Sequence, residues 1–190
     1  MAPQSNTRQR MLTSAVELLQ ERGAAGVTID AILARSQAPR GSVYYHFPGG
    51  RNQIMTESLS IAGDTITAII DDSARKGPLA TLHTVGRFWN RILRDSDFAA
   101  GCPVAAAAVG GSPDDQHLAP IVANIFTTWH TALAEALEDS GVEHGRANRL
   151  ASTAIAAIEG AVILARSARS TDPVDDIITE LEAMLASAMT

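Results

Sequence analysis

The chain has 190 residues, of which 15 are basic and 21 acidic, and hydrophobic residues make up 46% of it. Its longest uninterrupted apolar stretch, Cys102–Val109, has eight residues, whereas a helix that crosses a membrane needs about twenty. We therefore expect no membrane-spanning segment, and the single cysteine, which excludes an internal disulfide, fits a cytoplasmic protein. Alanine supplies 33 positions and aromatic residues only 4%, a composition that favours helix over strand.

The first fifty residues predict three helices. Apolar residues recur at helical spacing over residues 7–22, which indicates a first helix. Thr28 is a favourable N-cap for a second helix over residues 29–35. Pro39 stands where a helix accepts proline, at the first position of a third helix over residues 39–46. A tight turn joins the last two helices, which is the geometry of a helix-turn-helix.

Six further helices are predicted behind residue 50. Their expected ranges are 51–76, 79–94, 102–109, 113–139, 145–169 and 172–189. The chain contains no repeat of 20–50 residues and no convincing alternation of apolar and polar residues. We therefore predict an all-α protein of about nine helices.

Charge is divided unevenly along the sequence. Residues 1–52 carry six arginines against three acidic residues, a net charge of +3, and the remaining residues carry a net charge of −9. Such asymmetry suggests that the two parts meet different partners. The alternative is that each part only presents a solvated surface.

Aromatic side chains cluster at the end of the third predicted helix. Both tyrosines of the chain, Tyr44 and Tyr45, stand beside His46 and Phe47. Tyrosine and histidine donate hydrogen bonds to phosphate oxygens while their rings pack on the protein. The alternative is that Tyr45 and Phe47 fill the small core of the three-helix unit, and for Phe47 we prefer this second interpretation.

The start of the same helix has residue types that are typical of a DNA-recognition helix. Arg40, expected in its first turn, can make a forked contact with guanine in a major groove. Gly41 allows the backbone to approach closely, and Ser42 adds a small polar contact.

The front of the chain closely resembles the amino-terminal DNA-binding domain of TetR-type transcriptional repressors. The resemblance is carried by TIDAI at residues 28–32 and by APRGSVYYHF at residues 38–47, followed by a long helix. Two further segments, HFPGG at residues 46–50 and GCPV at residues 101–104, resemble the LmrA/YxaF subgroup.

The resemblance implies a helix-turn-helix domain over residues 1–50, a connecting helix over 51–76, and an effector-binding and dimerisation domain over 77–190. The expected DNA contacts are Thr28, Pro39, Arg40, Gly41, Ser42, Tyr44, Tyr45, His46 and Arg51. Arg51 stands where the family usually has a lysine that meets a phosphate, so the charge is kept and the geometry changes. Pro39 stands where most relatives have a capping serine, so the third helix can begin differently.

The resemblance also implies a homodimer on a double-stranded, roughly palindromic operator, with its recognition helices in successive major grooves about 34 Å apart or a little more. The last two helices would then form a four-helix bundle with their symmetry mates. Two apolar stripes agree with this: Leu150, Ala151, Ala154, Ile155, Ile158, Ala161, Val162 and Ala165, then Val174, Ile177, Ile178, Leu181, Met184, Leu185 and Ala188. Periodicity alone does not distinguish such a stripe from an intrachain core.

A small-molecule effector is expected to bind in the domain over residues 77–190. The candidate pocket residues are Phe88, Trp89, Ile92, Phe126, Trp129 and His130, with His83 and Glu159 as polar anchors. Each of these aromatic residues could instead be plain core. We expect the effector to favour a conformer of the dimer in which the spacing of the two DNA-binding domains does not match DNA. The long helix that starts at Arg51 would transmit this change.

Two other classes of protein remain as alternatives. One is a small-molecule hydrolase or redox protein that uses Cys102, although no basic residue adjoins this thiol in the sequence to activate it. The other is a helical interaction module that does not bind DNA. The five histidines do not fall at metal-ligand spacings, so neither a metal nor a cofactor is expected. We therefore predict a regulator rather than an enzyme.

Overall fold

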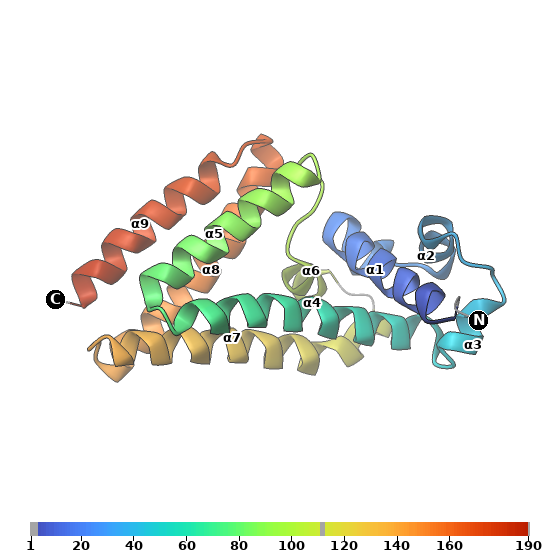
Figure 1. Ribbon diagram of the computed structural model, residues 1–190, viewed down its shortest axis with the longest axis horizontal. Coiled ribbons are helices and arrows are strands. Elements are labelled where there is room, and N and C mark those ends of the chain that lie inside the picture. The colour runs from blue at the N-terminus through green and yellow to red at the C-terminus, as the bar shows by residue number, and fades with distance from the viewer. Residues whose placement is uncertain (1–3, 111–112, 190) are drawn as a thin grey trace. The chain divides into compact units, whose positions relative to one another are not determined.

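The computed structural model describes residues 4–110 and 113–189, with side chains from residue 7 onwards. All regular secondary structure in these ranges is helical, which confirms the predicted all-α fold (Figure 1). Contacts group the chain into two compact units, Met1–Asp64 with Cys102–Ala123 and Thr65–Gly101 with Asn124–Thr190. We call the first the head unit and the second the body unit.

The head unit is built around α1, which packs against both α2 and α6. Its helices are α1 (Gln4–Arg22), α2 (Ile29–Ser36), α3 (Ser42–His46), the first part of α4 (Gly50–Ala74) and α6 (Pro103–Val109), with the 3-10 turns η1 (Ala24–Gly26) and η2 (Pro113–Leu118). Large apolar side chains from all four of the first helices fill its core: Met11, Leu12, Leu18, Leu19, Ile32, Val43, Phe47, Ile54, Met55 and Leu59.

The body unit is a bundle in which α5 (Pro78–Asp95), α8 (His144–Ala168) and α9 (Asp172–Ala188) pack against one another (Figure 1). The second part of α4 and most of α7 (Ala119–Asp139) complete it. The core side chains are again apolar and include Leu82, Trp89, Leu93, Trp129, Leu137, Val162, Leu181 and Leu185. Because α4 and α7 each contribute residues to both units, they are the helices that link the head unit to the body unit.

The third helix starts later than the sequence indicates. It begins at Ser42 and not at Pro39, so Arg40 lies in the preceding turn and not in the first helical turn. The reason is that the Ser42 amide donates to the Pro39 carbonyl at 2.9 Å, and the Ser42 hydroxyl donates to the same oxygen at 2.6 Å. This carbonyl is thereby engaged in a four-residue turn, Pro39 to Ser42, and the α-helical pattern of bonds four residues apart starts after it.

The helix predicted over residues 113–139 is divided in two. Residues Pro113–Leu118 form the turn η2, and the α-helix begins at Ala119. Pro120 explains the division, because it has no N–H to donate to the carbonyl four residues earlier and its ring clashes with that carbonyl in a continuous helix. Near the start of α7, where the first N–H groups have no helical acceptor, the same proline costs nothing.

The two stripes that were expected to favour dimerisation are mostly intrachain core. In α8, Leu150, Ala151, Ala154, Ile158, Ala161, Val162 and Ala165 are buried, as are Val174, Ile178, Leu181 and Leu185 in α9. The small residues of α8 allow the close approach that was expected of them, but the helices that approach are α5 and α9 of the same chain.

By length and composition, α8 alone among the described helices could cross a membrane. A single helix of this kind is weak evidence for insertion, because the core helix of a globular protein has the same composition. Here the apolar face of α8 packs against α5 and α9, as a core helix does.

Candidate nucleic-acid interface and effector cavity

The short helix α3 is anchored by two buried side chains and presents two exposed ones. Val43 and Phe47 are fully buried, while Tyr44 and Tyr45 are 68% and 67% exposed. The core role preferred for Phe47 is therefore confirmed, and the same role is wrong for Tyr45. His46 is half-buried, and its ring and the Tyr45 ring form a T-shaped pair with 5.0 Å between centroids. Exposed phenols on a rigidly anchored helix are suited to contact a partner surface.

Thr28, Pro39, Arg40 and Gly41 are exposed around α3, and Ser42 is half-buried. The Thr28 hydroxyl accepts a hydrogen bond from the Ala31 amide at 3.1 Å, which caps α2 as predicted and leaves its own proton available to donate. A Cβ placed on Gly41 would meet no atom within 4 Å, so this position is open space in the free protein.

Arg40 forms a surface ion pair with Asp30, at 2.9 Å from Nη2 to Oδ1. Both side chains are more than three-quarters exposed, and ion pairs of this kind contribute about 0–1 kcal/mol. The pair joins the turn before α3 to the first turn of α2, and because it is weak, another acceptor can replace Asp30 at little cost.

Arg51, for which a phosphate contact is predicted, makes its contacts within the head unit in this structure. Its Nε donates to the Val27 carbonyl at 2.6 Å, Nη2 donates to the Ala24 carbonyl at 2.8 Å, and Nη1 is 2.6 Å from Asp115 Oδ1. The Asp115 side chain is only 2% exposed. These contacts use the guanidinium inside the head unit, where it joins the start of α4 to the turn before α2 and to η2. The structure thus supports a positioning role for Arg51.

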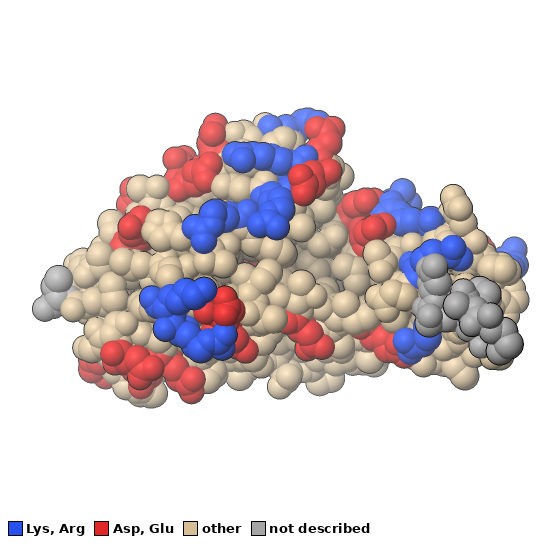
Figure 2. Space-filling view, viewed as in Figure 1, with Lys and Arg blue, Asp and Glu red and all other residues tan. Residues whose placement is uncertain are grey.

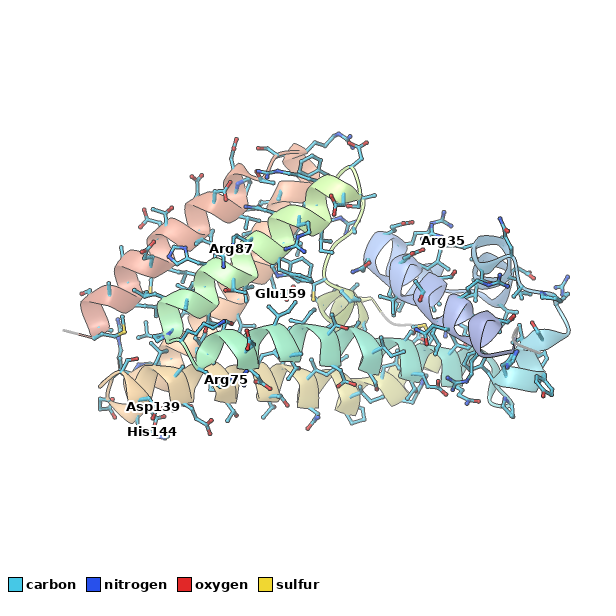
Figure 3. The ribbon with its side chains drawn as sticks, viewed as in Figure 1. Arg35, Arg75, Arg87, Asp139, His144 and Glu159 are labelled. Atoms are coloured by element: carbon cyan, nitrogen blue, oxygen red, sulfur yellow. The ribbon has the colours of Figure 1, made fainter. Side chains whose placement is uncertain are left out.

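Arg35 makes a second internal ion pair that sequence reasoning missed. Its guanidinium binds the Glu21 carboxylate with two hydrogen bonds of 2.9 and 2.6 Å, which fastens α2 to α1 (Figure 3). The hydrogen bond from Arg35 lowers the pKa of Glu21 below its ordinary value of 4.5, and the same bond raises the pKa of Arg35. The pair lies fourteen residues apart, beyond any local pattern.

The net charge of the head unit differs from the net charge of residues 1–52. The head unit as the contacts define it holds six arginines and seven acidic residues, so it is not net positive. Arg8 pairs with Glu57, and Arg35 and Arg51 make the internal ion pairs described above. The exposed arginines of the head unit are Arg10, Arg22 and Arg40. In the body unit, acidic side chains gather over α9 (Figure 2). Attraction to DNA would therefore depend on where these arginines lie, and not on the unit's net charge.

The body unit contains a small cavity between α4, α5, α7 and α8. It is lined by Ile66, Ile70, Thr81, Leu82, Val85, Trp89, Trp129, Leu133, Ile155, Ile158 and Glu159. Its volume of about 40 Å³ holds a few water molecules and no drug-sized ligand. A drug-sized molecule would fit only if the surrounding helices moved apart.

Three of the residues expected around an effector line this cavity: Trp89, Trp129 and Glu159. The lining residues do not include Phe88, Ile92, Phe126, His130 or His83. Phe88 and Phe126 instead contact the two tryptophans edge to face, at 5.0 and 5.3 Å between ring centroids. His130 Nε2 lies 3.0 Å from the Asn148 carbonyl, and His83 lies 3.4 Å from Glu182.

Cys102 has a structural role at the start of α6. The thiol is buried, and its sulfur accepts a hydrogen bond from the Ala105 amide at 3.4 Å, as an N-cap. Among the described residues, no group of three or more His, Cys, Asp or Glu side chains could hold a metal ion.

Comparisons with known proteins agree with this architecture. Residues 11–55 match the bacterial regulatory proteins of the tetR family, and residues 78–180 match the C-terminal domain of the LmrA/YxaF-like transcriptional regulators. The HTH-type transcriptional regulator Rv0196 of Mycobacterium tuberculosis is 36% identical over 96% of this chain and 95% of its own length. The HTH-type transcriptional repressor DhaR of a Mycobacterium species is 25% identical over 95% of this chain and 93% of its own.

The fold is shared with solved structures of low sequence identity. The regulatory protein TetR from Rhodobacter sphaeroides superposes with a TM-score of 0.82 at 21% identity, covering 93% of this chain and 97% of that one. Taken with the two matched segments and the relative at 36% identity, this shows that the chain belongs to the TetR family of bacterial transcriptional regulators, with a C-terminal domain of the LmrA/YxaF-like kind.

Proposed function

We propose that this protein is a transcriptional repressor that binds a palindromic DNA operator as a homodimer and leaves it when a small, largely apolar effector binds the body unit. The observation that carries the proposal is the presentation of α3. Buried Val43 and Phe47 fix the helix while Arg40, Tyr44 and Tyr45 point outward. This is the arrangement by which a recognition helix meets base edges and phosphates. The relative DhaR is a transcriptional repressor, which supports repression as the direction of control.

A second exposed surface supports the homodimer. Ile163 and Leu164 on α8 are 61% and 58% exposed, and Met184 on α9 is also exposed. Gly160 lies one turn before them on the same face of α8, and a Cβ placed there would meet no atom within 4 Å. We call this face of α8 and α9 the outer apolar face. A second copy packed on it would remove these apolar side chains from water, and Gly160 would allow the helices to approach closely.

The effector step is proposed as a shift between two conformers. The cavity in the present conformer is too small for an effector, so a ligand stabilises only a conformer in which α4, α5, α7 and α8 are further apart. Both α4 and α7 also carry residues of the head unit, and α4 begins with the Arg51 contacts. To change operator occupancy from nearly full to nearly empty, the effector must prefer the expanded conformer by about 5.5 kcal/mol.

The test is a comparison of operator and random DNA. An operator is selected from a pool of random duplexes, and its affinity is measured beside a scrambled duplex over a series of salt concentrations. The proposal predicts a steep fall of affinity with salt and a preference for the operator of at least about 10³-fold. Equal affinity for the two duplexes at every salt concentration would refute operator recognition. We place this activity in the cytoplasm, where the DNA of a bacterium lies.

A further inference from the structure

We infer that the exposed face of α5 and α9 binds the same face of a second dimer, so that dimers of this protein associate weakly through complementary charge. The inference goes beyond the proposed function and rests on it in one respect, that the outer apolar face forms the homodimer and leaves the α5–α9 face exposed. The two helices meet at a polar seam on this face. Asn90 Nδ2 donates to Asp175 Oδ1 at 2.6 Å, and Arg94 Nη2 donates to Thr171 Oγ1 at 3.0 Å.

Three arginines form a row along the exposed side of α5, which we call the basic row. Arg87, Arg91 and Arg94 are all exposed, and they stand four and three residues apart, so they share one face of the helix. With Asn90 and Asp95 they line a shallow groove of about 460 Å³. None of the three forms an ion pair with another described residue. The groove therefore presents three guanidinium groups and one carboxylate, and it suits the acidic side chains of a partner.

Three aspartates lie across the seam at the start of α9, and we call them the acidic row. Asp172, Asp175 and Asp176 are all exposed. Asp172 and Asp176 stand one helical turn apart, and within the described part of the chain neither forms an ion pair. Figure 2 shows the result, in which basic side chains over α5 lie beside acidic side chains over α9. Charges of both signs thus stand free on one face of the body unit.

The face is complementary to itself. The seam contacts join later residues of α5 to earlier residues of α9, so the helices are antiparallel and the end of α5 that carries Arg94 lies beside the acidic row. A two-fold axis above the seam and parallel to it places α5 of each copy over α9 of the other, with these ends together. Each basic row then faces the acidic row of the second copy. A two-fold axis across the helices would place arginine over arginine, which like charge disfavours.

The size of the face indicates a weak association. With 18 residues α5 is about 27 Å long, and two helices side by side are about 20 Å wide, so the face offers about 500 Å² on each copy. A total of about 1,000 Å² is at the lower limit for a specific complex. The net charge of −6 on each chain also opposes the approach of two copies. Local complementarity must overcome this repulsion, and salt screens exposed ion pairs of this kind.

Sedimentation equilibrium of the full-length protein measures the association. Each chain has a mass of 20.0 kDa, and the homodimer has twice this mass. In about 0.5 M NaCl, where the Debye length is about 4 Å, we expect the mass of the homodimer. In about 50 mM NaCl, where the Debye length is about 14 Å, the weight-average mass should rise above that of the homodimer as the protein concentration increases.

Two double variants each reverse one row. Arg87→Glu with Arg91→Glu makes the basic row acidic, and Asp172→Arg with Asp176→Arg makes the acidic row basic. Each should associate at least about tenfold more weakly than the natural protein at the lower salt concentration. The second result is the sharper one, because this variant changes the net charge from −6 to −2 and thereby lowers the overall repulsion. An equal mixture of the two variants should associate within about threefold of the natural protein, since each reversed row then meets a complementary one.

The matched control is Arg146→Glu with Arg149→Glu, which changes the net charge as much as the reversal of the basic row does. Both positions are exposed near the start of α8. This start, marked by His144, lies well away from Arg87 (Figure 3). The control should associate within about threefold of the natural protein. Circular dichroism and melting temperature establish that each variant is folded.

Three results would overturn the inference. The natural protein has the mass of the homodimer at both salt concentrations, the control weakens association as much as the reversals do, or the mixture of the two reversals stays dissociated. If dimers do not associate and reversal of the basic row instead weakens binding to a scrambled duplex, the face belongs to DNA and the inference is also wrong. A mass of 20.0 kDa at the higher salt concentration, with the charge-dependent association intact at the lower one, would refute the proposed homodimer and support this face.

Discussion

Replacing Arg51 by methionine separates the role that the structure supports from the phosphate contact that the sequence indicated. The guanidinium makes four hydrogen bonds inside the head unit, two of them to Asp115, and the side chain of Asp115 is 2% exposed. Removing one member of a buried ion pair costs about 3–5 kcal/mol, because the charge that stays behind is poorly solvated. We expect Arg51→Met to lower the free energy of unfolding by about this amount.

Urea unfolding followed by circular dichroism measures the change. Asp115→Asn should cost less, about 1–3 kcal/mol, since the amide oxygen still accepts a hydrogen bond and no carboxylate is left behind. The double variant should be more stable than the sum of the two single losses predicts, because both substitutions remove the same interaction. A phosphate contact would give the opposite pattern. If Arg51→Met changes stability by less than about 0.5 kcal/mol, yet weakens binding to all duplexes and reduces the salt slope by about one, the reasoning here is refuted.

Three further predictions concern other surfaces. Arg40→Ala should change the free energy of unfolding by no more than about 1 kcal/mol, because the pair of Arg40 with Asp30 is exposed. The same variant should weaken operator binding by about 1–3 kcal/mol with little effect on binding to random DNA. An equal loss of affinity for both duplexes would assign Arg40 to a phosphate contact. The pKa of Glu21 is lowered by Arg35, so the pair stabilises the fold fully above pH 4.5 and loses its effect as the pH falls through the lowered pKa. Acid titration of unfolding should show a smaller loss below that pH for Glu21→Gln than for the natural protein, and identical curves would contradict the pair's contribution. Leu164→Asp, on the outer apolar face, should convert a dimer to a folded monomer in sedimentation, and an unchanged dimer would place the interface elsewhere.

The sequence predicted the helices well and their ends less well, for identifiable reasons. The hydrophobic period locates each helix, but the ends depend on single backbone groups. The start of α3 is moved by the Ser42 hydroxyl bound to the Pro39 carbonyl. The start of α7 is set by Pro120, whose position in the sequence could have been used to predict it.

The structural environment of the residues around the candidate DNA-binding surface was predictable where local pattern decides it, and not where it depends on residues far apart in the sequence. Thr28 as a cap and Phe47 as core follow from their neighbours in the chain. The pair of Arg51 with Asp115 joins residues 64 apart, and no local signal indicates that segment 102–123 packs in the head unit. Counting charge along the sequence overestimated the positive charge of the head unit for the same reason.

The cavity illustrates the limit of choosing residues by type. Aromatic character selected Phe88 and Phe126, which brace the tryptophans and do not line the cavity. Val85 and Leu133 lie four residues from Trp89 and Trp129 on the same helix faces, and both line it. Including the residue one helical turn away from each tryptophan would therefore have identified Val85 and Leu133 as lining residues. The apolar stripes of α8 and α9 show a second limit. The sequence pattern of a buried helix face is the same whether the face packs against its own chain or against a second copy.

The most direct test of the account is the motif that the protein selects from a pool of random duplexes, compared between the natural protein and Arg40→Ala. The account predicts that the natural protein enriches a two-fold symmetric motif whose half-site centres lie about 34 Å apart or a little more. It also predicts that Arg40→Ala loses preference at one guanine-bearing position in each half. Enrichment of no motif by the natural protein, or of the same motif with undiminished preference by Arg40→Ala, would contradict the claim that the turn and helix around Arg40 and Tyr44 read DNA.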